Sequence, residues 1–292
     1  MVRELTSGAL LDALRGAHWP ARRMSRGAFQ GGHRSRRVGA SPEFMEYRPY
    51  QQGDDPSRID WKLFGRTERV AVRLSHDDSS LRTMVLLDAS GSMAFPAGTQ
   101  AKWKTAAAIA LGLAAVTHGD NDPVGIGIAS SPPRVIPPRS RRGVVGDVLR
   151  ALLETTPEGS SPLTPLFMAA RTSRRVALIS DFLGDAEPLL ALAREKVAGG
   201  TEVFAVHLVD PIELEPGRAA RVVTDPENPA IRRPLGPAEL EAYRSRFAEW
   251  RDALAREWRG AGAFYHQVST ADAPDRVVRR VTGFAEPAPR GA

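Results

Sequence analysis

The sequence predicts an α/β protein with a mostly parallel, doubly wound sheet that is flanked by helices. From residue 82 onward, short apolar runs of strand length alternate with longer runs of helical period over about 200 residues, a pattern typical of strand–helix–strand units. Two of the short runs, residues 84–87 and 176–179, are apolar without alternation, which indicates strands buried on both faces. A chain of 292 residues can bury the core that such a sheet needs.

The elements are expected in a regular order along the chain. Strands are predicted at residues 68–75, 82–88, 124–129, 134–137, 175–181, 201–209, 221–224 and 263–268. Helices are predicted at residues 5–24, 100–118, 142–153, 186–198, 237–259 and 274–284, with a further helix opening near Thr164. Only Ser-Ser-Pro-Pro separates the third strand from the fourth, so these two are predicted to form a hairpin at the edge of the sheet.

The domain organisation follows from changes in composition. Residues 1–78 are predicted to form an N-terminal extension, with a basic helix, a loop and a signature segment that packs on the core, and residues 79–284 to form the α/β domain. Within that domain, the turn-rich residues 211–235 interrupt the alternation and predict a small β insertion. Residues 285–292 are rich in proline and glycine and predict a disordered tail.

The helix predicted at residues 237–259 carries an aromatic stripe. Its apolar positions step by three or four residues, as on one face of a helix, and they are Leu240, Tyr243, Phe247, Trp250, Leu254 and Trp258. Such a stripe is far more often core packing than a recognition surface. We therefore expect it to be buried.

Composition excludes several classes of protein. The chain has no cysteine, which excludes disulfides, thiolate catalysis and cysteine-ligated zinc. Its longest uncharged apolar stretch, residues 105–117, is shorter than the ~20 residues that a membrane span needs. The N-terminus lacks the basic segment and apolar run of a signal peptide. We expect a soluble, cytoplasmic protein without a membrane span.

The net charge of +6 is concentrated near the N-terminus, where residues 1–48 hold nine arginines and four acidic residues. A basic arm of this kind can bind nucleic acid or an acidic partner surface, and it can equally be a solvated arm. No helix-turn-helix pattern or set of interleaved exposed aromatics accompanies it. Nucleic-acid binding is therefore the least favoured of the functions considered.

A cluster of oxygen-bearing side chains follows the apolar run 84–87. Asp88, Ser90 and Ser92 occupy alternate positions, so in extended backbone they point to the same side. Ligands of open α/β sheets bind at the carboxyl ends of strands, and oxygen ligands are those that Mg²⁺ prefers. Thr164 and Asp181 are candidates to complete the shell, although a threonine at a helix start is also a common N-cap and an aspartate after a strand a common turn residue.

Taken together, these residues resemble a known site. Asp88-Ala-Ser-Gly-Ser92, Thr164-Pro-Leu and Ser180-Asp181 are similar to the three elements of the metal-ion-dependent adhesion site of von Willebrand A domains, whose fold is Rossmann-like. The resemblance implies that the hydroxyls of Ser90, Ser92 and Thr164 coordinate Mg²⁺ or Mn²⁺ directly. It implies that Asp88 and Asp181 act directly or through water. One coordination position is then expected to stay open for a carboxylate of a partner protein.

A second resemblance lies ahead of the α/β domain and extends over residues 5–284. The segment resembles the signature of the bacterial "domain of unknown function 58" family, in residues Glu43, Phe44, Glu46, Arg48, Tyr50, Gly53, Asp54, Asp55, Arg58, Asp60 and Trp61. The resemblance implies an adaptor for a MoxR-type AAA+ ATPase in protein-complex assembly or metal insertion. The expected partners are that ATPase and a protein that bears an acidic residue, and no small-molecule substrate is expected.

An enzymatic alternative starts from Asp88, because an aspartate at a strand end can attack phosphorus in a metal-dependent phosphatase or phosphotransferase. That chemistry needs a second acidic residue two positions on as general acid, and this position is Ser90. The sequence also lacks the Gly-x-x-x-x-Gly-Lys-Ser/Thr loop of P-loop nucleotide-binding proteins. A non-enzymatic binding module is therefore the favoured prediction.

Overall fold

The computed structural model describes residues 8–22, 46–50, 59–74, 81–184, 186–217, 222–224, 232–234 and 236–283. The chain separates into two compact units. The larger unit combines residues 1–25 with residues 81–292, and the smaller unit consists of residues 26–80. Each is described by itself.

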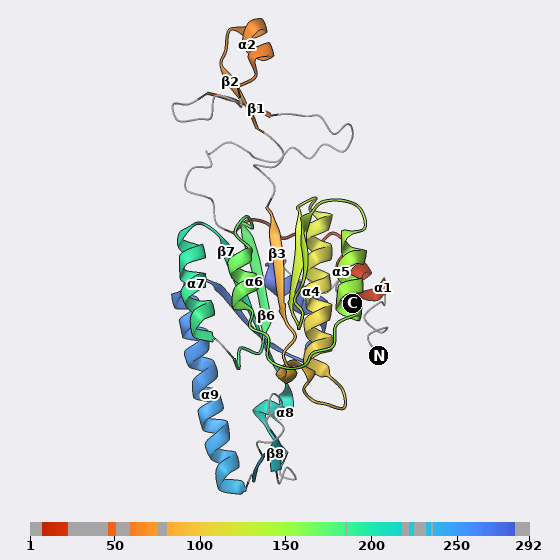
Figure 1. Cartoon of the computed structure of the whole chain (residues 1–292), viewed down its shortest axis with the longest axis vertical. Helices are drawn as coiled ribbons and strands as arrows, with labels where there is room; N and C mark the ends of the chain where they lie inside the picture. Colours follow the sequence, from red (N-terminus) through yellow and green to blue (C-terminus); the bar gives the residue numbers. More distant parts are fainter. Residues whose placement is uncertain are drawn as a thin grey trace, which may run out of the picture. The chain divides into compact units, whose positions relative to one another are not determined.

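A six-stranded sheet forms the centre of the larger unit (Figure 1). Its strands lie in the order β10-β7-β6-β3-β4-β5, and all neighbours are parallel except β4 and β5, which form an antiparallel hairpin at the edge. The bounds are β3 (Thr83–Asp88), β4 (Val124–Ala129), β5 (Arg134–Arg139), β6 (Arg175–Ser180), β7 (Glu202–Val209) and β10 (Phe264–Ser269). The predicted mostly parallel, doubly wound sheet is confirmed.

Helices cover both faces of this sheet, because the strand side chains alternate between two apolar cores. In β3, Val85 and Leu87 face one core, and Met84 and Leu86 face the other. The first core is closed by α1 (Gly8–Ala13) with the segment after it, α4 (Ala101–Gly119), α5 (Val144–Leu153) and α10 (Pro274–Thr282). The second is closed by α6 (Thr164–Ala169), α7 (Ala186–Ala198) and α9 (Pro237–Gly260).

The small β insertion is also present. After β7 the chain forms α8 (Pro211–Leu214) and then two short strands, β8 (Val222–Thr224) and β9 (Arg232–Pro234), which pair antiparallel. α9 follows, and Figure 1 shows it extending past the end of the sheet. The aromatic stripe on α9 is therefore only partly core. Leu254 and Trp258 are buried, whereas Tyr243, Phe247 and Trp250 are half-buried and stack on one another.

The N-terminal residues differ from the prediction. The described part of the expected helix 5–24 is helical only in α1, and Gly16, at a φ of +74°, follows in a left-handed conformation that continues no helix. The chain then runs without helix into the core, where Trp19 is 1% exposed and meets Phe204 edge-on at 5.0 Å between ring centroids. The first residues thus belong with the α/β domain, rather than with one segment 1–78.

An ion pair at the beginning of β6 and β7 holds this N-terminal segment. Arg175 is fully buried, and its Nε donates to Glu202 Oε2 at 3.0 Å. Its two terminal nitrogens donate to the carbonyl oxygens of Trp19 and Pro20, at 2.9 and 3.0 Å. The guanidinium also lies 4.3 Å from the ring centroid of Trp19. The cluster lies at the edge of the sheet where the strands begin.

The smaller unit contains β1 (Glu46–Pro49), α2 (Trp61–Thr67) and β2 (Ala71–Leu74), with β1 and β2 antiparallel. Asp60 is buried and caps α2 by accepting from the backbone amides of Lys62 and Leu63. Trp61, in contrast, is 63% exposed. Two more signature residues, Glu46 and Arg48, lie in β1, and Tyr50 directly follows it. Six signature residues lie outside the described residues: Glu43, Phe44, Gly53, Asp54, Asp55 and Arg58.

Three predictions remain untested by the described residues. The tail 285–292 and most of the arginine-rich arm lie outside them. The packing of the signature segment on the core stays a prediction as well. In the described part of the chain, no helix combines the length and apolar composition that crossing a bilayer requires.

Candidate metal site at the ends of β3 and β6

The candidate site lies where the sheet changes its direction of growth. From β3 the chain adds β4 on one side and β6 on the other, so the connections from the ends of β3 and β6 leave in opposite directions. A crevice at the carboxyl ends of two such strands is the usual ligand position in open α/β sheets. Asp88 is the last residue of β3 and Ser180 the last of β6, with Asp181 directly after it.

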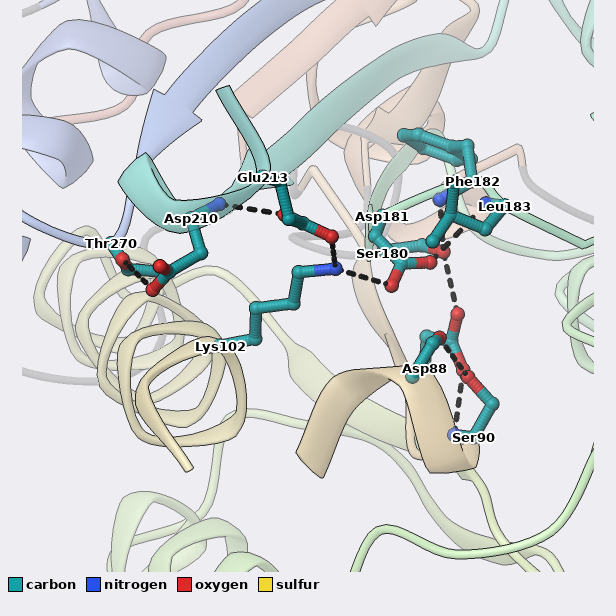
Figure 2. A network of polar contacts seen from close by, with 11 residues as sticks. Asp88, Ser90, Lys102, Ser180, Asp181, Phe182, Leu183, Asp210, Glu213 and Thr270 are labelled. Atoms are coloured by element: carbon teal, nitrogen blue, oxygen red, sulfur yellow. Dashed lines mark hydrogen bonds and ion pairs between the residues drawn. The ribbon is translucent and has the colours of Figure 1, made fainter. Parts of the chain in front are cut away.

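Hydrogen bonds gather the first predicted ligands around the Asp88 carboxylate. Its Oδ1 accepts from the Ser90 amide at 2.8 Å, and its Oδ2 accepts from the Ser180 hydroxyl at 2.6 Å (Figure 2). The hydroxyls of Ser90 and Ser92 lie 3.1 Å apart. The expected extended backbone includes Ser90 but not Ser92, because residues 91–94 form a 3-10 helix, yet the two hydroxyls stay in contact.

The charge of this cluster is poorly compensated within the protein. Burial and repulsion by Asp181 raise the pKa of Asp88 to about 6, although the hydrogen bonds from Ser180 and Ser90 work in the opposite direction. A carboxylate with a raised pKa is one whose ionised form would gain from a nearby cation. The electrostatics therefore favour a metal ion at this position.

Thr164 contributes an orphaned hydroxyl. It is the first residue of α6, and its Oγ1 is buried without a hydrogen-bond partner among the described residues. Leu163 occupies the N-cap position of α6, so Thr164 is not the N-cap, the alternative that the sequence left open. A buried hydroxyl without a partner costs about 1–3 kcal/mol. A ligand that this oxygen could coordinate would remove that cost.

Asp181 is engaged by a residue that the sequence did not reveal. The ammonium of Lys102, near the start of α4, lies 2.9 Å from Asp181 Oδ2 and 2.5 Å from Glu213 Oε1 (Figure 2). Attraction by these two carboxylates outweighs the effect of burial and raises the pKa of Lys102. Asp181 Oδ1 also accepts from the Leu183 amide at 3.2 Å, the turn contact expected for an aspartate after a strand. The signal available in the sequence was the pair Lys102 and Lys104 at the start of an otherwise largely apolar helix.

The same network continues to the inserted segment. Glu213 lies in α8, where its second carboxylate oxygen accepts from the Asp210 amide at 2.8 Å in a capping box. Asp210 in turn accepts from the Thr270 hydroxyl at 2.6 Å, just after β10. Burial raises the pKa of Glu213, although Lys102 opposes the rise. A continuous chain of polar contacts thus joins Asp181 to the start of the insertion.

The donor set suits a hard cation. The described residues contain no group of three or more histidine, cysteine, aspartate and glutamate side chains placed to hold a metal. Asp88, Ser90, Ser92 and Thr164 supply carboxylate and hydroxyl oxygens, which Mg²⁺ and Mn²⁺ accept. Asp181 fits less simply, because Lys102 already neutralises it. The residues present therefore fit the ion, although Lys102 would compete with it for Asp181.

A cavity of about 400 Å³ opens beside this cluster. Its polar side is formed by Asp88, Ser90, Ser180 and two serines of the loop before α6, and its apolar side by residues such as Leu163, Phe182 and Leu189. Among the described residues that line it, Asp88 is the only one with an ionisable side chain.

Comparison with known proteins identifies the family. Residues 46–253 match the family model described as "Protein of unknown function DUF58". The chain is 30% identical over 264 residues to uncharacterized protein Rv1480 of Mycobacterium tuberculosis and to uncharacterized protein Mb1516 of Mycobacterium bovis, an alignment that covers 87% of this chain and 83% of each relative.

Solved structures with similar folds include BatB from Bacteroides thetaiotaomicron, with 16% identity, a TM-score of 0.44 and coverage of 69% of this chain and 96% of that chain. A von Willebrand factor type A protein from Catenulispora acidiphila has 13% identity and a TM-score of 0.37, over 74% and 43% of the two chains. The order and direction of the strands define the fold independently of these likenesses. The family match and the mycobacterial relatives show that the chain belongs to the DUF58 family, whose function is unknown.

Proposed function

We propose that this protein is a non-enzymatic interaction module that binds Mg²⁺ or Mn²⁺ and docks an acidic residue of a partner protein. The observation that carries the proposal is the serine–aspartate cluster at the switch point of the sheet. It is joined by the buried, unpartnered hydroxyl of Thr164, which directly follows Leu163 of the adjacent cavity. Ser90, Ser92, Thr164 and Asp88 would hold the ion, with Asp181 direct or through water. The bound ion would supply a cationic position that attracts a carboxylate.

The chain's own residues would orient the partner. Hydrogen bonds from the Ser90 amide and the Ser180 hydroxyl hold both oxygens of the Asp88 carboxylate, so its orientation toward the ion would be fixed. Leu163, Phe182 and Leu189 form an apolar wall of the adjacent cavity. A partner with an acidic side chain next to an aliphatic one would match both the ion and this wall.

The proposed partner class is a MoxR-type AAA+ ATPase, with a role in protein-complex assembly or metal insertion. This part of the proposal rests on the family resemblance of the signature segment. Co-purification of the ATPase with the wild-type protein in Mg²⁺, and its loss in Ser90→Ala, would support it. If the Ser90→Ala variant still co-purified with the ATPase, the interaction would not depend on the metal site. The cytoplasmic location stays a prediction.

Magnesium should raise the thermal stability of the wild-type protein. At one hundred times the dissociation constant, binding stabilises the folded state by about 2.7 kcal/mol, which thermal unfolding resolves. Thr164→Val should abolish this gain and should at the same time stabilise the metal-free protein by about 1 kcal/mol, because it removes an unpartnered hydroxyl. Asp88→Ala should also abolish the gain.

Thr117→Val is the matched control, because Thr117 is also a helical threonine with a buried hydroxyl, but this hydroxyl donates to the Leu113 carbonyl at 2.8 Å. It should keep the full effect of magnesium. A wild-type protein that gains no stability from Mg²⁺ or Mn²⁺ would contradict the proposed site. Metal-dependent phosphatase turnover that is lost in Asp88→Asn would instead support the enzymatic alternative.

A further inference from the structure

Lys102 is a buried cation placed directly beside the proposed metal site. Its side chain is 1% exposed, and its backbone amide donates to the Phe95 carbonyl at 3.1 Å, which fixes the start of α4. The ammonium lies 5.7 Å from the Phe95 ring centroid and contacts one carboxylate on each side, Asp181 at 2.9 Å and Glu213 at 2.5 Å. The ammonium thus makes contacts in three directions and lies at the junction of two segments.

One positive charge is therefore shared between two carboxylates with different attachments. Asp181 follows β6 and belongs to the predicted metal ligands, whereas Glu213 belongs to α8 at the start of the inserted segment. A metal ion near Asp88 attracts Asp181 and competes with Lys102 for it. When Asp181 turns to the ion, Lys102 keeps only Glu213 as an anionic partner among these contacts.

We propose that Lys102 is an internal counterion that restrains Asp181 from the metal, and that Glu213 sets how firmly it does so. The inference rests on the proposed metal site and deepens it. Lys102 and Glu213 are positioning residues that act on the ion through Asp181. Because coupling between two sites is reciprocal, metal binding must also alter the contacts of α8.

The inserted segment is the element that this coupling reaches. Glu213 accepts from the Asp210 amide, and Asp210 is held by Thr270, so the start of α8 is anchored on the sheet side. Beyond α8 the chain continues into β8 and β9, and the link back to the metal site passes through the Glu213 side chain. A protein that binds the insertion would therefore change the metal affinity, and the metal would change the affinity for that protein.

The two substitutions that test this idea should have opposite effects on metal affinity. Lys102→Met removes the competing cation and should tighten Mg²⁺ or Mn²⁺ binding by about fivefold or more, within the usual range of coupling between sites. Glu213→Gln leaves Asp181 as the sole anionic partner of Lys102 and should weaken binding by a similar factor. Affinities are measured by calorimetric titration of the full-length protein with each metal ion at constant pH and ionic strength.

Each variant has a matched control for the change in net charge. Lys104→Met removes a lysine two residues away on the same helix, and Glu215→Gln removes an exposed carboxylate directly after α8. Opposite shifts beyond those controls support the inference. Affinities of Lys102→Met and Glu213→Gln that equal their controls, or shifts of the same sign, overturn it. Glu213→Gln preserves the Lys102–Asp181 pair and decides the matter alone if Lys102→Met does not fold.

Hydrogen exchange gives a second measurement that a purely structural role of Lys102 would not move. Saturating metal should increase the protection of the Asp210 amide, which donates to Glu213, in the wild type and not in Lys102→Met. The outcomes also separate this inference from the proposed function. If Lys102→Met binds the metal and the wild type does not, the result supports the proposal that Lys102 restrains Asp181 and contradicts the proposed function. Binding by neither protein overturns both.

Discussion

Replacing Arg175 with methionine should lower the free energy of unfolding by about 3–5 kcal/mol, the usual cost of leaving one partner of a buried ion pair alone. The substitution removes the cationic partner of the Glu202 carboxylate, which is 2% exposed and otherwise accepts from the Arg22 amide. It also removes the donors to the carbonyl oxygens of Trp19 and Pro20 and the contact with the Trp19 ring. Urea unfolding gives the change in free energy, and hydrogen exchange at residues 18–22 should report a loosened segment.

Two further variants define this prediction. Arg174→Met, at the exposed neighbouring position, should change stability by less than about 0.5 kcal/mol. The double variant Arg175→Met with Glu202→Met should recover much of the loss, because an apolar pair can replace a buried ion pair at little cost. A double variant as unstable as the single one would show that the lost contacts to the Trp19 and Pro20 carbonyls, and not the loss of the cation beside Glu202, carry the effect.

Acid should destabilise the protein between pH 6.5 and pH 4, through His207 and His266. Burial, together with nearby cations, lowers the pKa of both imidazoles to about 4, from an unfolded value of 6.5, although Asp181 opposes the shift at His207. In this window the unfolded chain binds protons that the folded chain does not, so stability is lost as the pH falls. A shift of this size corresponds to about 3 kcal/mol for each group at most.

The raised pKa of Asp88 has the opposite effect on stability as the pH falls. Between its unfolded value of 3.8 and about 6, the folded protein binds the proton more tightly, so this carboxyl gains stability as the pH falls. Urea unfolding of the metal-free protein at pH 7 and pH 5 tests both the histidine contribution and the Asp88 contribution. His207→Gln and His266→Gln should each flatten the fall in stability, and Asp88→Asn should steepen it. Histidine variants that show the wild-type dependence would contradict this account.

Much of the fold could be predicted because its strands are buried on both faces. Such strands appear as short apolar runs, and the runs predicted at 82–88, 124–129 and 175–181 agree with β3, β4 and β6 to within a residue. The helix at 186–198 agrees with α7 at both ends. Local periodicity is enough for these elements, since each carries its own burial pattern. It could not show that Gly16 ends the first helix.

The candidate site was predictable only in part, because local sequence patterns do not contain contacts between residues far apart in the chain. Asp88, Ser90 and Ser92 are close in sequence, so their spacing shows that they belong together. Lys102 reaches partners 79 and 111 residues away, and no local pattern contains that pairing. The half-buried aromatic residues of α9 depend in the same way on where the sheet ends. The contacts that set the charge of the site are those that only the tertiary structure determines.

The anchoring of Trp19 and Pro20 by Arg175 has a consequence for chain topology. The amide of Arg175 donates to the Arg82 carbonyl at 3.1 Å, while its side chain holds the carbonyls of residues 19 and 20. One residue therefore clamps the two stems between which residues 26–80 are inserted. Loop-closure entropy grows only slowly with length, so with the stems fixed this segment can lengthen, shorten or be exchanged while the α/β unit keeps its core. The α/β unit is thus discontinuous in sequence, and residues 26–80 are an insertion between its two parts.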